Sequence, residues 1–155
     1  MSESILRDQL IAQLEGGQAY LPVADIFEGF PIEQAGVRID GIRHTPWELL
    51  EHLRIAQWDI LFFTLDPNHI TPTWPQEHWP TAEAPDSDED WNISVSVFLS
   101  ELDQVKALAR DPKTPLFEKI PHGSGQTYLR EILLVADHNA HHLGQLLMLR
   151  RALET

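Results

Sequence analysis

The 155-residue sequence contains no cysteine. Disulfide bonds are therefore excluded, and so are metal or redox sites built on thiolates. A chain without cysteine suits a reducing compartment. The opening segment MSESILRDQLIAQ has neither the basic region nor the apolar region of a signal peptide, so we expect a cytoplasmic protein.

Long hydrophobic runs and an excess of basic residues are missing too. The longest apolar candidate, DILFFTL, falls far short of the ~18 residues that a membrane helix needs, so no membrane partner is expected. Acidic residues number 24 against 11 basic ones, which gives a net charge of −13. A surface that acidic repels phosphate backbones, so we expect no nucleic-acid partner and instead a small neutral or singly charged substrate.

The residues that are present predict one all-helical domain over positions 1–155. Apolar residues make up 43% of the chain and charged residues 23%, which is normal for a globular domain of this length. Apolar positions recur at helical spacing in four main segments. The predicted helices cover about 4–15, 46–65, 88–110 and 128–153, and a further short helix covers about 22–30.

The second main helix has the clearest beginning. Thr45-Pro46-Trp47-Glu48 has the pattern of a capping box with proline at the first helical position. In a capping box the Thr45 side chain and the Glu48 side chain each bond a free backbone N–H of the first turn. The helix is therefore predicted to begin at Pro46.

Three loops join the main helices, at residues 31–44, 66–87 and 111–127. The longest, 66–87, contains five prolines together with Trp74 and Trp79, and a loop of this length is usually functional or disordered. The tryptophans indicate that it packs against the domain. We expect an antiparallel up-down-up-down four-helix bundle with long connecting loops, in which the second and fourth main helices run parallel.

Three histidines fall close together in DHNAHHLGQ, residues 137–145. At about 100° per residue, His138 and His142 lie about 40° apart on one face of a helix, whereas His141 turns toward the polar side. Two imidazoles one turn apart can bind one ion. His52 lies on the apolar face of the second main helix, and in the expected parallel arrangement its height differs from that of His138 by roughly one turn.

The spacing leaves two interpretations open for these residues. In the first, His52, His138 and His142 bind a metal ion and His141 lies at the rim. In the second, the three inward histidines are core residues that need no metal.

Three further side chains are candidates for catalysis. Glu48 lies one turn before His52 and is predicted to be a fourth ligand, a general base, or only part of the capping box. His44 and His122 lie in the 31–44 and 111–127 loops. In the expected topology both loops flank the same end of the bundle, so both histidines are predicted to line the mouth of the site.

The remaining polar residues near these segments have less defined roles. Gln145 is predicted to hydrogen-bond a metal-bound water or a substrate, or simply to be a polar residue of the last helix. His69 and His78 belong to the 66–87 loop. They are expected at the opposite end of the bundle unless that loop folds back.

The segments WELLEHLRIAQWDI and ADHNAHHLGQL resemble the DinB-like family of metal-binding four-helix bundles, which is unrelated to the DNA polymerase of the same name. The resemblance extends over nearly the whole chain. It rests on a lone histidine in the second main helix and an HxxHHxGQ run in the fourth. It implies a divalent metal ion held by the residues that match the family ligands, His52, His138 and His142. Members of the family are often dimers, so the resemblance also implies a homodimer. Several related enzymes are metal-dependent hydrolases or thiol S-transferases, whereas many members have no assigned activity, so the resemblance implies an enzyme of one of these two kinds without deciding between them.

Three neutral imidazoles would leave coordination positions open on the ion, as in catalytic metal sites. An ion of this kind supports hydrolysis through an activated water, or transfer of a bound thiol. The expected cofactor is one divalent ion (Zn, Ni, Fe or Mn), because imidazole suits several of these metals. The alternatives are a non-catalytic bundle with a structural metal and a bundle without metal.

A second apolar stripe on the last helix predicts a homodimer. It lies nearly opposite the face that carries His138 and His142, and Ala136, Ala140 and Gly144 would permit a close approach of another helix. The alternative is that the stripe packs inside its own bundle. The stripe consists of Leu129, Ala136, Ala140, Leu143 and Leu147.

Overall fold

The structure is a computed structural model, and it describes residues 2–154. Over these residues the chain is all-helical, with five α-helices, two short 3-10 turns and no strand. None of the described helices is long and apolar enough to cross a membrane. The elements in chain order are α1 (Ser2–Glu15), α2 (Val23–Phe27), η1 (Ile32–Gln34), α3 (Pro46–Leu65), η2 (Gln76–His78), α4 (Asp88–Arg110) and α5 (Tyr128–Leu153).

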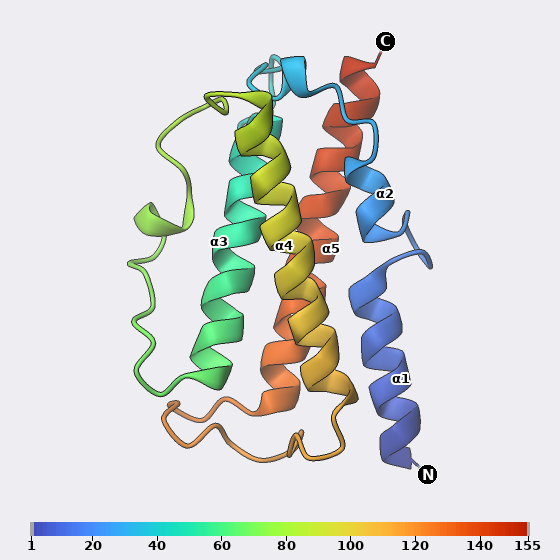
Figure 1. Cartoon of the computed structure of the whole chain (residues 1–155), viewed down its shortest axis with the longest axis vertical. Coiled ribbons are helices and arrows are strands. Elements are labelled where there is room, and N and C mark those ends of the chain that lie inside the picture. The colour runs from blue at the N-terminus through green and yellow to red at the C-terminus, as the bar shows by residue number, and fades with distance from the viewer. Residues whose placement is uncertain (1, 155) are drawn as a thin grey trace.

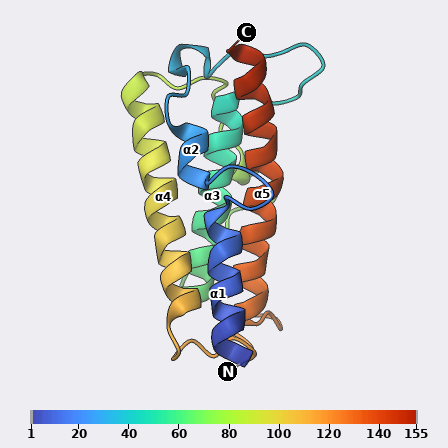
Figure 2. The same cartoon turned by 90° about the vertical axis from the view of Figure 1, so that its right-hand side faces the viewer.

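The four long helices pack side by side, and the short α2 extends the column of α1 (Figures 1 and 2). Figure 2 shows α4 and α5 on either side of α1, with α3 behind it. In Figure 1 the chain runs upward in α1 and α5 and downward in α3 and α4. Each long helix therefore has one parallel and one antiparallel neighbour.

Hydrogen bonds between helices show the same directions. Between α3 and α4, Glu51 pairs with Ser94 and Gln57 pairs with the Phe98 carbonyl, so the numbers rise together and the two helices run parallel. Between α3 and α5, Asn139 donates to Gln57, whereas His142 packs against His52. The residue numbers therefore rise along α3 as they fall along α5. The α3–α5 pair is therefore antiparallel.

The expected up-down-up-down order was wrong, and the cause is the segment 66–87, here called the crossover segment. It returns along the outside of the bundle to the end where α3 began (Figure 1), so consecutive helices α3 and α4 run the same way. Its roughly 22 residues span up to ~70 Å when extended. The 20-residue α3 is only about 30 Å long, so the segment is long enough to reach either end of that helix.

Side-chain caps mark the beginnings of three of the long helices. The capping box at Thr45 is present: the Thr45 hydroxyl accepts from the Glu48 N–H at 3.2 Å, and the Glu48 carboxylate accepts from the Thr45 N–H at 2.8 Å. Ser87 and Thr127 cap α4 and α5 with one such bond each, since their hydroxyls accept from the N–H groups of Asp90 and Arg130. The first two helices differ slightly from the predicted ranges of about 4–15 and 22–30: α1 begins at Ser2, and α2 is limited to Val23–Phe27.

The second apolar stripe of α5 lies largely within the chain's own core. Leu143 is 0% exposed and Leu147 is 9% exposed, and Leu129 and Ala136 pack against the same core. Ala140 alone of the five is exposed. The stripe therefore offers a partner much less surface than the sequence pattern indicates.

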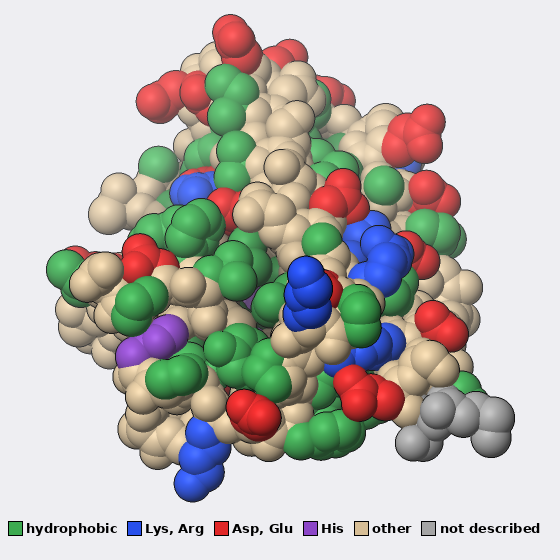
Figure 3. All heavy atoms as spheres, turned by 60° about the horizontal axis from the view of Figure 1, so that its bottom comes forward, with side chains coloured by type: hydrophobic (Ala, Val, Ile, Leu, Met, Phe, Trp, Pro, Cys, Tyr) green, Lys and Arg blue, Asp and Glu red, His purple; other side chains and the backbone are tan. Residues whose placement is uncertain are grey.

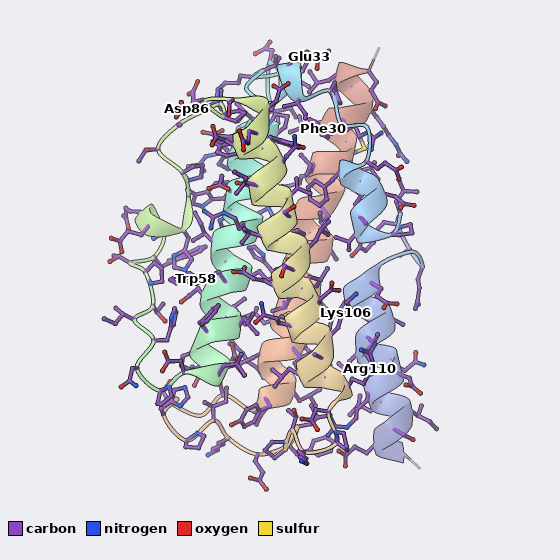
Figure 4. The ribbon with its side chains drawn as sticks, viewed as in Figure 1. Phe30, Glu33, Trp58, Asp86, Lys106 and Arg110 are labelled. Carbon is purple, nitrogen blue, oxygen red and sulfur yellow. The ribbon has the colours of Figure 1, made fainter. Side chains whose placement is uncertain are left out.

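Charged side chains cover the outside of the bundle. Figure 3 shows acidic and basic side chains interspersed with hydrophobic ones on the end that carries the 111–127 loop. Where α4 faces α1, Lys106 lies between the two helices (Figure 4), and its Nζ is 3.7 Å from the Glu15 carboxylate. This ion pair joins α1 and α4 at their edge.

Candidate metal centre

The structure brings His52, His138 and His142 together, and these residues are called the histidine cluster below. His52 comes from α3 and is 1% exposed, while His138 and His142 are half-buried on one face of α5. One nitrogen from each ring lies within 4.8 Å of the other two. The Nε2 atoms of His52 and His138 are 3.0 Å apart, close to the ~3.3 Å expected for two nitrogens on a tetrahedral ion with bonds of about 2.0–2.1 Å.

The three residues meet for a different reason from the one we predicted. We expected parallel helices with the histidines at similar depths from their starts. The helices are antiparallel, and His52 near the beginning of α3 meets the middle of α5. The prediction of which residues come together is confirmed, and the helix direction used to reach it was wrong.

Hydrogen bonds to the other ring nitrogens orient two of the three imidazoles. Nδ1–H of His52 donates to the His78 carbonyl at 2.7 Å, and Nδ1–H of His142 donates to Oε1 of Gln145 at 2.7 Å. With the proton on Nδ1, the Nε2 lone pair is free to bind a metal ion. Gln145 therefore positions His142. Nδ1 of His138 is buried and has no hydrogen-bond partner in the described part of the chain.

Burial keeps the histidine cluster uncharged at neutral pH. Burial, together with the neighbouring imidazoles, lowers the pKa of His52 to about 4 and that of His138 to about 3. It also lowers the pKa of His142. Metal binding requires neutral imidazole, so the cluster is in the form that accepts an ion at pH 7.

The crossover segment closes one side of the cluster. The Trp79 ring lies between two histidine rings, with centroids 3.7 Å from His52 and 4.0 Å from His44 and nearly parallel planes. The preceding residue, His78, supplies the carbonyl that holds His52. The segment thus contributes both a stacking partner and a hydrogen-bond acceptor to the site.

Asp59 of α3 holds the crossover segment in this position. Its two carboxylate oxygens lie 2.7 Å from Nε2 of His69 and 3.1 Å from Nε2 of His78. Trp58 lies on the side of α3 that faces the segment (Figure 4), and its ring packs edge-on against His69. We expected these histidines at the far end of the bundle unless the loop folded back, and the loop does fold back.

The three catalytic candidates occupy different places. His44 lies beside the cluster, stacked on Trp79, and burial lowers its pKa. Glu48 is engaged in the capping box and with Arg38, and it lies outside the group of ligand atoms.

His122 is at the other end of α3, where its Nε2–H donates to the Phe63 carbonyl at 2.6 Å. Phe63 lies eleven residues beyond His52, about 16 Å along the helix. The expectation that His122 lines the mouth was wrong, because the N-termini of α3 and α5 lie at opposite ends of the bundle.

A cavity of about 640 Å³, here called the site cavity, reaches His52 and His142 from outside. Its other walls come from the loop before α3 and from the crossover segment, and include Arg43, His44, Glu48, Trp74 and Trp79. His141 is exposed and lies outside the histidine cluster, as predicted from its angle on the helix. An ion bound by the cluster would therefore be within reach of a small molecule in this cavity.

Sequence reasoning missed Trp79 and the His78 carbonyl. The only signal for Trp79 was its place in a proline-rich loop with two tryptophans, which indicated packing without a location. A backbone carbonyl leaves no signal in residue type at all.

A family model described as the DinB superfamily matches residues 13–146. No curated protein and no solved structure matches the chain. The matched range contains α2 to α4, the crossover segment and all three members of the histidine cluster.

Proposed function

The chain belongs to the DinB superfamily, and we propose that it is a metal-dependent enzyme in which His52, His138 and His142 bind one divalent ion. The observation that carries this proposal is the convergence of three neutral imidazoles beside a cavity that opens to solvent. A set of three histidine ligands leaves room on the ion for a substrate or a water molecule, which is typical of catalytic sites.

When bound, the ion would act as a Lewis acid that lowers the pKa of a water molecule or of a substrate thiol, which supports a hydrolase or a thiol S-transferase. The protein's own groups would orient the ligands and handle protons. The backbone carbonyl of His78 orients the His52 ring, and the side-chain carbonyl of Gln145 orients the His142 ring. His44 lines the same cavity, and because its pKa is lowered it is available there as a neutral proton acceptor.

A structural ion in a non-catalytic bundle is the second candidate. It is favoured by the burial of His52 and by the position of the cluster between α3 and α5, where an ion would join two helices. The site cavity favours the enzyme, because a structural zinc site is normally closed by protein ligands.

Metal titration of the purified protein tests the ligand assignment. We expect one ion per chain, and we expect His142→Ala to abolish binding. His141→Ala is the matched control, since it removes the neighbouring imidazole from the exposed side of the same helix, and it should leave affinity nearly unchanged. The 3.0 Å contact of His52 and His138 also suits a hydrogen bond between two Nε2 atoms in a metal-free core. A wild-type protein that takes up no divalent ion would establish that alternative.

Measurements of turnover test the proposal that the protein is an enzyme. Ester, amide and thiol-transfer substrates would be screened with apo and metal-loaded protein, while melting temperature is followed on the same samples. We expect activity only in the loaded form, lost with a chelator and restored by the ion. Suppose the ion raises the melting temperature and no substrate turns over; the structural-metal candidate then replaces the enzyme.

A further inference from the structure

A second cavity, here called the apolar cavity, lies next to the site cavity. It has a volume of about 670 Å³, within the ~300–1,000 Å³ that is usual for small-molecule sites. It is formed by the loop before α3, which stands out beside the last turns of α5 in Figure 2. Its apolar walls are Ile39, Ile42, Leu49, Met148, Leu149 and Ala152.

The two cavities share part of their walls. Arg43 and His44 line both, so the two spaces adjoin at these two residues, and a molecule in the apolar cavity would have one end close to the site cavity. Gln145, which holds the His142 ring, also lines the apolar cavity. Residues that orient the cluster thus lie at the junction of the two spaces.

Arg43 is the positive charge at this junction. Arg43 is exposed, and no ion pair or hydrogen bond joins its guanidinium to the described residues, although the chain carries an excess of carboxylates. Nearby Arg38, in contrast, is held by Glu48 and Glu83. An unpaired arginine between an apolar space and a reactive one is suited to bind a carboxylate.

We infer that the apolar cavity and Arg43 together bind a medium-chain aliphatic carboxylate, with the hydrocarbon chain in the cavity and the carboxylate on the guanidinium. Such a molecule would carry its reactive group near the carboxylate, where it faces the site cavity. The role as substrate rests on the proposed function, whereas the binding itself needs only the cavity and the arginine. The single negative charge also agrees with a strongly acidic protein, which repels more highly charged ligands.

Calorimetric titration of the metal-loaded protein with hexanoate, octanoate and decanoate tests the inference. Affinity should rise about two- to fourfold for each added methylene, because each CH₂ is worth up to about 0.8 kcal/mol when buried. Octanoate should bind at least tenfold more tightly than octylammonium, which has the same chain and the opposite charge. Equal affinities for these two, or no dependence on chain length, would overturn the inference.

Two pairs of variants locate the ligand. Arg43→Gln should weaken the binding of octanoate about tenfold and leave the binding of neutral octanol unaffected, whereas Arg110→Gln, at the far end of α4 (Figure 4), should change neither.

Met148→Asp should weaken the binding of both ligands about tenfold, because it places a charge in the apolar wall. Its control is Leu133→Asp, another exposed apolar position of α5 that lies outside the cavity. If Arg43→Gln has no more effect than Arg110→Gln, the assigned site is wrong.

Two further measurements keep this test separate from that of the metal. Metal content is determined on every sample, and octanoate is also titrated into apo protein, where its affinity should stay within about threefold. If octanoate binds but the protein takes up no metal, the proposed function is overturned and the carboxylate site is supported. If the fully metal-loaded protein does not bind octanoate, the carboxylate site alone is overturned. A shift of the Met148 methyl resonance on adding octanoate checks the location without any substitution, and its absence counts against the inference.

Discussion

Gln57 joins three helices through a single side-chain amide. Its Nε2 donates to the Phe98 carbonyl of α4 at 2.8 Å, and its Oε1 accepts from Nδ2 of Asn139 on α5 at 2.9 Å. Gln57 is fully buried and Asn139 nearly so, so neither lost hydrogen bond would be replaced by water. The pair therefore fixes the relative height of α3, α4 and α5 close to the histidine cluster.

Replacing Gln57 by Leu should lower the free energy of unfolding by about 2 kcal/mol, because it leaves a buried amide without its partner. Urea denaturation measures the change. The matched control is Gln13→Leu, at an exposed position of α1, which we expect to stay within about 0.5 kcal/mol of the wild type. Similar losses in the two variants would contradict the role assigned to Gln57.

Glu101 makes stability depend on pH. Burial raises its pKa to about 7, against the opposing effect of Arg54, and its Oε2 is buried with no hydrogen-bond partner among residues 2–154. A carboxyl whose pKa is raised by folding stabilises the protein fully below its ordinary pKa of 4.5, and this contribution is lost as the pH rises through about 7. Glu101→Gln should therefore raise the melting temperature at pH 8 relative to the wild type, and much less at pH 5. Glu118→Gln, at an exposed position, should show no such difference between the two pH values.

At the scale of whole elements, the crossover segment depends on Asp59. This carboxylate holds His69 and His78, and His78 in turn supplies the carbonyl that orients His52. Asp59→Asn keeps the size of the side chain and removes its charge. We expect metal affinity to fall about 10- to 100-fold, the usual effect of losing a group that orients a ligand.

A competition titration with a chelating dye measures that affinity, and tryptophan fluorescence follows the release of Trp79 from the His52 ring in the same samples. Asp8→Asn, on an exposed position of α1, is the control and should alter neither signal. If Asp59→Asn binds metal as tightly as the control does, then Asp59 holds the segment without orienting His52.

The long helices could be predicted from sequence because their ends are marked locally. The beginning of α3 was predicted from the capping box at Thr45, and those of α4 and α5 from the spacing of apolar residues; the structure adds that Ser87 and Thr127 cap these two helices. The direction of α4 could not be predicted. Apolar periodicity is the same for a helix that runs up or down, and the crossover segment is long enough to permit both.

The same distinction applies to the site. His138 and His142 were recognised because their spacing places them on one helical face, and His52 because it interrupts an apolar one. His44 was expected near the mouth and lies there, but His122 was misplaced together with the helix directions. The contacts of Trp79 and His78 depend on the path of the crossover segment. That path cannot be predicted from the spacing of apolar residues, because the segment is irregular.

At the scale of the whole molecule, the homodimer stays a prediction, made from the family resemblance and from the second apolar stripe of α5. The stripe that motivated it is mostly in the core, since Leu143 and Leu147 are buried within the chain. A dimer would therefore use other surface, such as the exposed Leu133 and Ala140 of α5. Light scattering at micromolar concentration should give twice the monomer mass of 17.7 kDa, and a mass of one chain would refute the dimer.

We expect the crossover segment to open before the rest of the molecule does. Polar contacts of a few side chains and one stacked ring hold it to α3, whereas α3 and α5 are joined by a continuous core and the Gln57–Asn139 pair. Backbone amides of residues 66–87 should therefore exchange with solvent through small, frequent openings, and those of central α3 only when the whole bundle unfolds. Because the crossover segment forms one wall of the site cavity, each such opening should widen the path to His52, so the rate at which a ligand enters can be altered without changing the stability of the four helices.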